Sequence, residues 1–79
     1  MQIINQRGDI VINTNMFAMI KLDDTSIVAR NDICSYVTLG KYDTRKIAEN
    51  EYRRLVMHLI SCNDKNHCMA RSDGTLQHI

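Results

Sequence analysis

One concentration of basic side chains in this sequence could bind phosphate. Arg53 and Arg54 are adjacent, and Lys46 precedes them by two turns of a predicted helix. Arginine suits phosphate because its planar guanidinium donates two parallel hydrogen bonds, and Tyr36 or Phe17 could stack on a base. These five side chains are the predicted ligand-binding residues. The simpler interpretation is a solvated helix face whose charge is balanced by glutamates, and the ordinary charge density favours it.

A second group, Cys62, His67 and Cys68, carries the side chains that zinc prefers. A structural zinc site needs four ligands, usually in closely spaced pairs. Here five residues separate the two cysteines, and His58 or His78 would have to be the fourth ligand. We therefore predict no metal site: Cys62 lies on the buried stripe of a helix, and the other two are ordinary loop residues.

The remaining reactive side chains do not predict an enzyme. A catalytic cysteine needs an adjacent base and a third group that orients it. The three histidines lie in the C-terminal third, whereas Cys34 belongs to a predicted strand with small and apolar neighbours. Asp23 and Asp24 are adjacent in a predicted turn, where carboxylates usually serve as turn formers. We expect no catalytic residues and no cofactor.

Length and composition describe one small globular domain. The chain has 79 residues, of which 44% are hydrophobic and 24% charged, and its formal net charge is +1. That charge is not typical of a dedicated nucleic-acid binder, which usually carries a strongly basic face. No apolar run reaches the roughly 20 residues of a membrane span, and no signal peptide is recognisable. Three cysteines without a secretory context are typical of free thiols, so we expect a cytoplasmic protein.

Short β-branched and alternating runs predict strands over the first forty residues. They cover residues 3–4, 10–12, 16–22, 26–30 and 33–39. Turn residues separate them, notably Gly8 beside Asp9, the pair at 23–24, and Asn31 beside Asp32. Consecutive strands joined by such short turns must be antiparallel, which predicts a β-meander.

Beyond Gly40 the hydrophobic period becomes that of a helix. Asp43 and Thr44 are good N-cap residues, and apolar side chains then recur at spacings of three and four as far as Cys62. We predict a helix over about residues 44–61 whose apolar stripe packs on one face of the sheet. The predicted fold class is α+β: an antiparallel meander of four or five short strands packed on one C-terminal amphipathic helix.

The predicted domain spans residues 1–62, and residues 63–79 form a C-terminal tail. The tail contains a strand-like run and an Asp73-Gly74 turn dipeptide. It either adds an edge strand or hairpin to the sheet or stays mobile, and the sequence leaves both alternatives open.

Five side chains share the second face of the predicted sheet: Phe17, Met19, Val28, Cys34 and Tyr36. One helix cannot cover both faces of a meander. An uncovered apolar face marks a site of partner binding or self-association. Because two-fold dimers are the commonest oligomers, we expect a homo-oligomer.

Residues 39–48 contain a recognisable pattern, Leu-Gly-x-Tyr-x-Thr, at the start of the predicted helix. With Ile3-Ile4-Asn5, Gly8-Asp9 and Met69, the chain resembles a group of small, mostly uncharacterised proteins from Gram-positive bacteria and their phages. The resemblance covers roughly residues 3–60 and implies a β-meander followed by an amphipathic helix. Helices of that group are often acidic on the outer face, whereas this one carries basic residues there.

The resemblance leads to a functional hypothesis by analogy. Phages use many such small proteins against host defence, which implies a non-enzymatic accessory protein that binds and neutralises a host defence component in the host cytoplasm. One version is an oligomeric sponge that sequesters a signalling nucleotide. The alternatives are a protein–protein inhibitor of a host defence nuclease, of the anti-CRISPR type, and a ligand-free structural or regulatory dimer.

Overall fold

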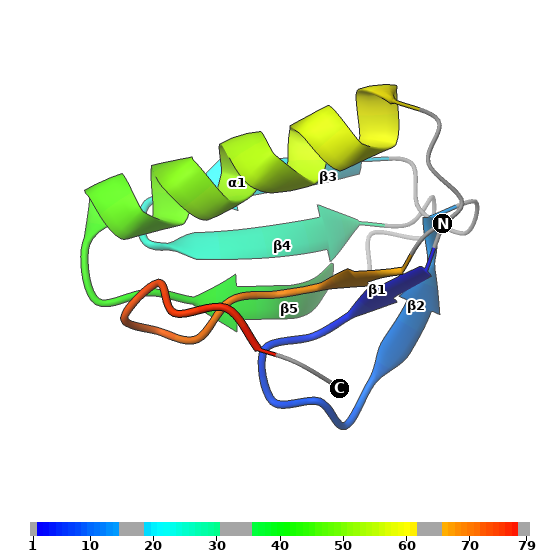
Figure 1. The fold of residues 1–79 in the computed structure, drawn as a ribbon, viewed down its shortest axis with the longest axis horizontal. Helices are drawn as coiled ribbons and strands as arrows, with labels where there is room; N and C mark the ends of the chain where they lie inside the picture. The colour runs from blue at the N-terminus through cyan, green and yellow to red at the C-terminus, as the bar shows by residue number, and fades with distance from the viewer. Residues whose placement is uncertain (1, 15–18, 31–35, 62–65, 78–79) are drawn as a thin grey trace.

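The computed structural model describes residues 2–14, 19–30, 36–61 and 66–77, and within them the fold is α+β (Figure 1). The predictions for Phe17, Cys34, Cys62, His78 and the turn at 31–32 lie outside these residues. The elements are β1 (Gln2–Ile4), β2 (Val11–Asn13), β3 (Met19–Asp23), β4 (Ser26–Arg30), β5 (Tyr36–Lys41), α1 (Arg45–Ile60) and β6 (His67–Cys68). The predicted fold class, a β-meander packed on one C-terminal helix, is confirmed.

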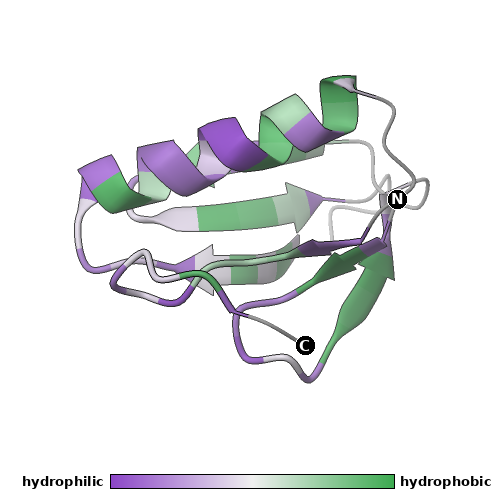
Figure 2. Cartoon of the chain, viewed as in Figure 1, coloured by the Kyte–Doolittle hydropathy of each residue, from purple (hydrophilic) through white to green (hydrophobic). Residues whose placement is uncertain are grey.

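The first sheet is the antiparallel meander β3-β4-β5, on which α1 lies (Figure 1). The turn between β3 and β4 has two residues, and Asp24 adopts a φ of 54°, a left-handed conformation that aspartate tolerates. Alternate side chains of the three strands enter the core beneath the helix: Ile20, Leu22, Ile27, Ala29, Val37 and Leu39. Figure 2 shows hydrophobic residues along the middle of β4 and largely hydrophilic residues through the middle of α1, whose first and last turns include hydrophobic ones.

The second sheet has the order β2-β1-β6. Strands β1 and β2 form an antiparallel hairpin whose turn includes Gly8 at a φ of 76°. The buried side chain of Asn5 holds this turn, because its Oδ1 accepts hydrogen bonds from the amides of Asp9 and Ile10, both at 3.1 Å. Strand β6 pairs parallel to β1, so residues that follow the helix add an edge strand to a sheet begun at the N-terminus.

Helix α1 begins and ends within a residue of the predicted range. Its N-cap is Thr44, whose hydroxyl accepts a hydrogen bond from the Ile47 amide at 3.2 Å. Ala48 and Leu55 are fully buried against the sheets. Among the helical residues that the structure describes, no stretch is long and apolar enough to cross a membrane.

Candidate functional site

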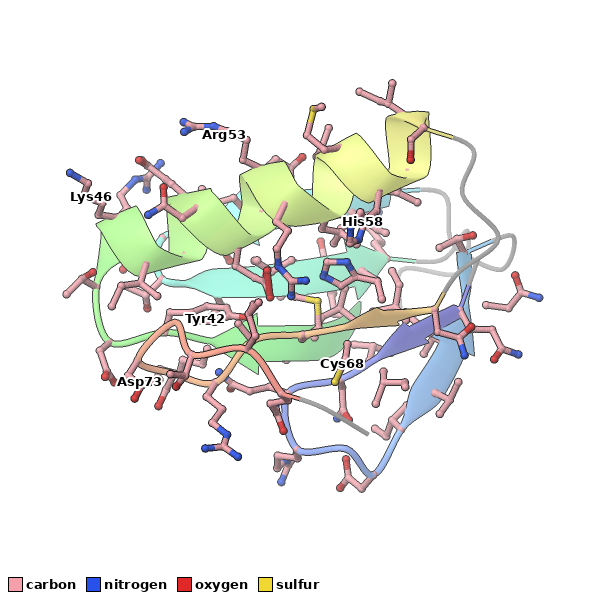
Figure 3. All side chains as sticks on the ribbon, in the orientation of Figure 1. Tyr42, Lys46, Arg53, His58, Cys68 and Asp73 are labelled. Carbon is pink, nitrogen blue, oxygen red and sulfur yellow. The ribbon has the colours of Figure 1, made fainter. Side chains whose placement is uncertain are left out.

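The structure separates the predicted ligand-binding residues into three environments. Lys46 and Arg53 project from the outer surface of α1, away from the sheets (Figure 3). Arg54, one position further along the helix, turns inward toward β6. Tyr36 lies on the face of the first sheet opposite the helix, and Phe17 is outside the described residues. The set therefore does not converge on one ligand.

Arg54 is held by an internal ion pair. Its Nε donates to Glu51 Oε1 at 2.6 Å and its Nη2 donates to Glu51 Oε2 at 2.8 Å, a bidentate arrangement within the helix. The same Nη2 donates to the Cys68 carbonyl at 2.8 Å. This guanidinium thus ties α1 to β6, and its fork serves the fold instead of an external phosphate.

Glu51 is a carboxylate with only 4% of its surface exposed. Besides both Arg54 bonds, it accepts a short hydrogen bond from the backbone amide of Ala70. Burial alone would raise the pKa of Glu51, but the His67 imidazole, the Arg54 guanidinium and the Ala70 amide together lower it to about 2. The side chain is therefore a buried, fully ionised anchor between the helix and the C-terminal segment.

A pair of histidines extends this network. The Nδ1 atoms of His58 and His67 are 2.6 Å apart with the rings at 71°, so one nitrogen donates a proton and the other accepts it. His67 is 1% exposed, and its Nε2 lies 3.8 Å from Glu51 Oε1, which is too long for a hydrogen bond. A proton on that Nε2 is electrostatically favoured because it faces the carboxylate. When both imidazoles are neutral, His58 Nδ1 therefore donates the hydrogen bond and His67 Nδ1 accepts it.

The expectation that His67 and Cys68 are loop residues was wrong, because they form β6 and His67 is buried. His67 faces α1, whereas Cys68 lies on the other side of β6 with a free, half-buried thiol (Figure 3). Within the described ranges, no three His, Cys, Asp or Glu side chains are placed to share a metal ion. The hydrogen bonds of Arg54 and Glu51 join α1 to β6 and to Ala70.

Tyr42 packs into the core beside the same network. It is 3% exposed, and its hydroxyl has no hydrogen-bond partner among the described residues. Burial, aided by the negative charge of Glu51, raises the pKa of this phenol well above its ordinary value. A Cβ at Gly40 would lie 2.7 Å from the Tyr42 oxygen. The glycine and tyrosine of the Leu-Gly-x-Tyr pattern are thus matched because the ring occupies the space that glycine leaves.

We expect the Tyr42→Phe substitution to leave the free energy of unfolding unchanged or to raise it by up to about 1 kcal/mol, since it removes a buried, unpaired hydroxyl. Urea denaturation of both proteins measures the difference. Tyr52→Phe is the matched control: the Tyr52 hydroxyl donates to the Ile20 carbonyl at 3.3 Å, so its loss should destabilise by about 0.5–1 kcal/mol. Destabilisation by Tyr42→Phe beyond that of the control would contradict an unpaired hydroxyl.

The outer face of the first sheet carries an aromatic side chain beside two cations. Tyr36 is 55% exposed, with Lys21 Nζ 5.8 Å and Arg30 Cζ 5.6 Å from its ring centroid. Both distances fall within cation–π range. Val28 is buried on this face. Within the described part of the strands, the exposed hydrophobic residues of this face are Met19 and Tyr36.

Strand register brings these three side chains together. Arg30 pairs with Tyr36 on one side, and Lys21 is opposite Val28 in the next row. The intervening residues Ala29 and Val37 enter the core, which places the Tyr36 face away from α1. The alternation of the predicted strands contained this signal, but Lys21 and Arg30 were not among the predicted ligand-binding residues.

Comparisons of the chain with protein-family models, curated proteins and solved structures found no match. The function must therefore be inferred from the geometry itself. That geometry offers an ion-pair network around buried Glu51 on the helix side and an exposed aromatic ring beside two cations on the other side.

Proposed function

We propose that this protein is a non-enzymatic binding protein that captures a small, phosphate-bearing nucleotide on the outer face of the β3-β4-β5 sheet. The exposure of Tyr36 beside Lys21 and Arg30 carries the proposal. Stacking of a base on an aromatic side chain contributes about 1–3 kcal/mol. Flanking cations attract the phosphates of the same ligand.

Each side chain has a distinct part in this proposal. The Tyr36 ring stacks on the base, and the positive charges of Arg30 and Lys21 beside it attract the phosphates. The three-strand face is short and the chain has a net charge of only +1. Both features favour a mononucleotide or cyclic dinucleotide over a long nucleic acid. Lys46 and Arg53, on the helix side, contact no ligand bound here.

We further propose that capture of the nucleotide serves to sequester it. In this role the protein is a phage-type accessory protein that withdraws a signalling nucleotide from a host defence pathway in the host cytoplasm. The support for this step is the resemblance of residues 39–48, and of the N-terminal segment, to small proteins of Gram-positive bacteria and their phages.

The test is calorimetric titration of the protein with AMP and with cyclic di-AMP, alongside amide chemical-shift mapping. We expect saturable binding of at least one of them, with shifts centred on β4 and β5. Tyr36→Ala should weaken the affinity by about tenfold or more, whereas Tyr36→Phe should retain it. Lys46→Ala is the control, because Lys46 is also exposed but lies on the opposite side. Absence of binding, or equal weakening by both alanine variants, would overturn the proposal.

A further inference from the structure

The two edges of the β3-β4-β5 sheet differ in how their backbone groups are satisfied. The β5 edge is closed by Gln6, whose amide donates to the Leu39 carbonyl at 2.7 Å. The Gln6 side chain also bonds both backbone groups of Lys41: its Nε2 donates to the carbonyl at 2.8 Å and its Oε1 accepts from the amide at 3.0 Å. Gln6 therefore covers this edge much as a neighbouring strand would.

Among the described residues, none covers the β3 edge in this way. In the described part of the chain, β3 pairs with β4 alone. A two-residue turn makes Asp23 and Ser26 a hydrogen-bonded pair, so the backbone groups of Ile20 and Leu22 point away from β4. The Tyr52 hydroxyl reaches the Ile20 carbonyl, in agreement with that direction. The amide and carbonyl of Leu22 face outward and match an extended backbone.

Side chains beside this edge form a shallow groove between β3 and α1. A cavity of about 250 Å³ is lined by Leu22, Glu49, Tyr52, Arg53 and Val56. The groove offers apolar surface together with one acidic and one basic side chain. An open edge strand above such surface is a template for pairing with another chain.

We infer that β3 pairs antiparallel with β3 of a second copy of this chain, about a two-fold axis at Leu22. In this register the two Leu22 residues exchange both backbone hydrogen bonds. Lys21 of each copy lies opposite Asp23 of the other, on the face away from the helices. A lysine on an edge strand commonly opposes pairing. In this dimer, however, the Lys21 of each copy faces the Asp23 carboxylate of the other copy, so two pairs of opposite charge form.

Charge selects this register over its neighbour. A shift that centres the axis on Lys21 would place the two lysines directly opposite each other, which is destabilising. The axis at Leu22 instead produces two reciprocal pairs of opposite charge. The observed spacing of Lys21 and Asp23 therefore fits a second copy of the same strand, which must be complementary to itself.

The position of the helix fits the same partner. Helix α1 lies over β3 and β4, so its axis is about one strand spacing, roughly 5 Å, from the two-fold axis. The two helices would then run antiparallel about 10 Å apart, which is a normal packing distance. Tyr52 and Val56 of each copy would fill the groove of the other. The result is one six-stranded sheet with both Tyr36 faces on the same side.

The test is sedimentation equilibrium of the full chain with substitutions that reverse and then exchange the charges. We expect a wild-type dimer, weakened about tenfold or more by either Lys21→Asp or Asp23→Lys, because each creates two like-charge pairs. The double variant, which carries both substitutions, should regain an affinity within about threefold of wild type. Lys41→Asp, on the edge closed by Gln6, should have no effect.

Three results would overturn the inference: a monomeric wild type, single variants that dimerise like wild type, or a double variant that does not recover. Far-UV circular dichroism of each variant establishes that it is folded before its assembly is measured. The inference does not rest on the proposed function. Nucleotide titration of Asp23→Lys, which keeps Tyr36, Arg30 and Lys21, separates the two: a variant that no longer dimerises but still binds nucleotide supports pairing through β3, whereas a variant that stays dimeric overturns it.

Discussion

Replacement of Glu51 by glutamine is expected to lower the free energy of unfolding by about 3 kcal/mol, because it leaves the half-buried Arg54 guanidinium without its counter-charge. The carboxylate accepts two hydrogen bonds from Arg54 and one from the Ala70 amide. A glutamine amide has one acceptor oxygen, so its NH2 group must face another donor. Urea denaturation at neutral pH, followed by circular dichroism, measures the loss.

Glu49→Gln is the matched control for this prediction. The same substitution two residues earlier removes an exposed ion pair with Arg45 at 3.0 Å, and exposed i,i+4 pairs on a helix contribute about 0.3–0.5 kcal/mol. A second variant replaces both partners of this ion pair, Glu51→Leu with Arg54→Met. It should recover much of the loss, because neither unpaired charge then remains. Equal effects of Glu51→Gln and Glu49→Gln would show that the buried network does not stabilise the fold.

Acidification is expected to remove about 3 kcal/mol of stability through Glu51 alone. The pKa of this carboxyl is about 2 in the folded protein, against an ordinary value of 4.5. Since the folded pKa is the lower one, the stabilisation is fully present above pH 4.5. It is lost progressively as the pH falls from there toward 2. Urea denaturation at intervals between pH 2 and pH 6 measures this dependence.

The Glu51→Gln variant isolates this contribution because it has no carboxyl at that position. Asp73, whose pKa is lowered by hydrogen bonds from Thr75, titrates in both proteins and cancels in the difference. The two stability curves should converge as the pH falls from 4.5 to 2. Parallel curves over that interval would mean that Glu51 titrates alike in the folded and unfolded states.

The meander and the helix could be predicted because their signals are local. Strand periodicity, the turn that includes Asp24 and the cap at Thr44 each depend on residues a few positions apart. Gly40 and Tyr42 are only two residues apart, and the Tyr42 ring fills the space that a side chain at position 40 would occupy. Such patterns can be recognised without knowledge of the tertiary structure.

The inward network could not be predicted in the same way. Arg53 and Arg54 have identical side chains, but successive positions on a helix differ by about 100° in direction, so one faces solvent and the other β6. The local indication that Arg54 turns inward was Glu51, which lies three residues before it. Its importance depends on Ala70 and His67, which the fold brings from beyond the helix. No local spacing relates those positions.

The parallel pairing of β1 with β6 bears on how the chain folds during its synthesis. Ile3 pairs with His67, so the second sheet cannot close until residue 68 has left the ribosome. An isolated two-stranded hairpin is marginally stable in water. Ile3, which is buried in the folded protein, lacks its neighbour in β6 until that strand has emerged. Contacts between residues this far apart slow folding. The β3-β4-β5 meander and α1, whose contacts are closer in sequence, can form first and serve as the surface on which the N-terminal hairpin and β6 assemble last.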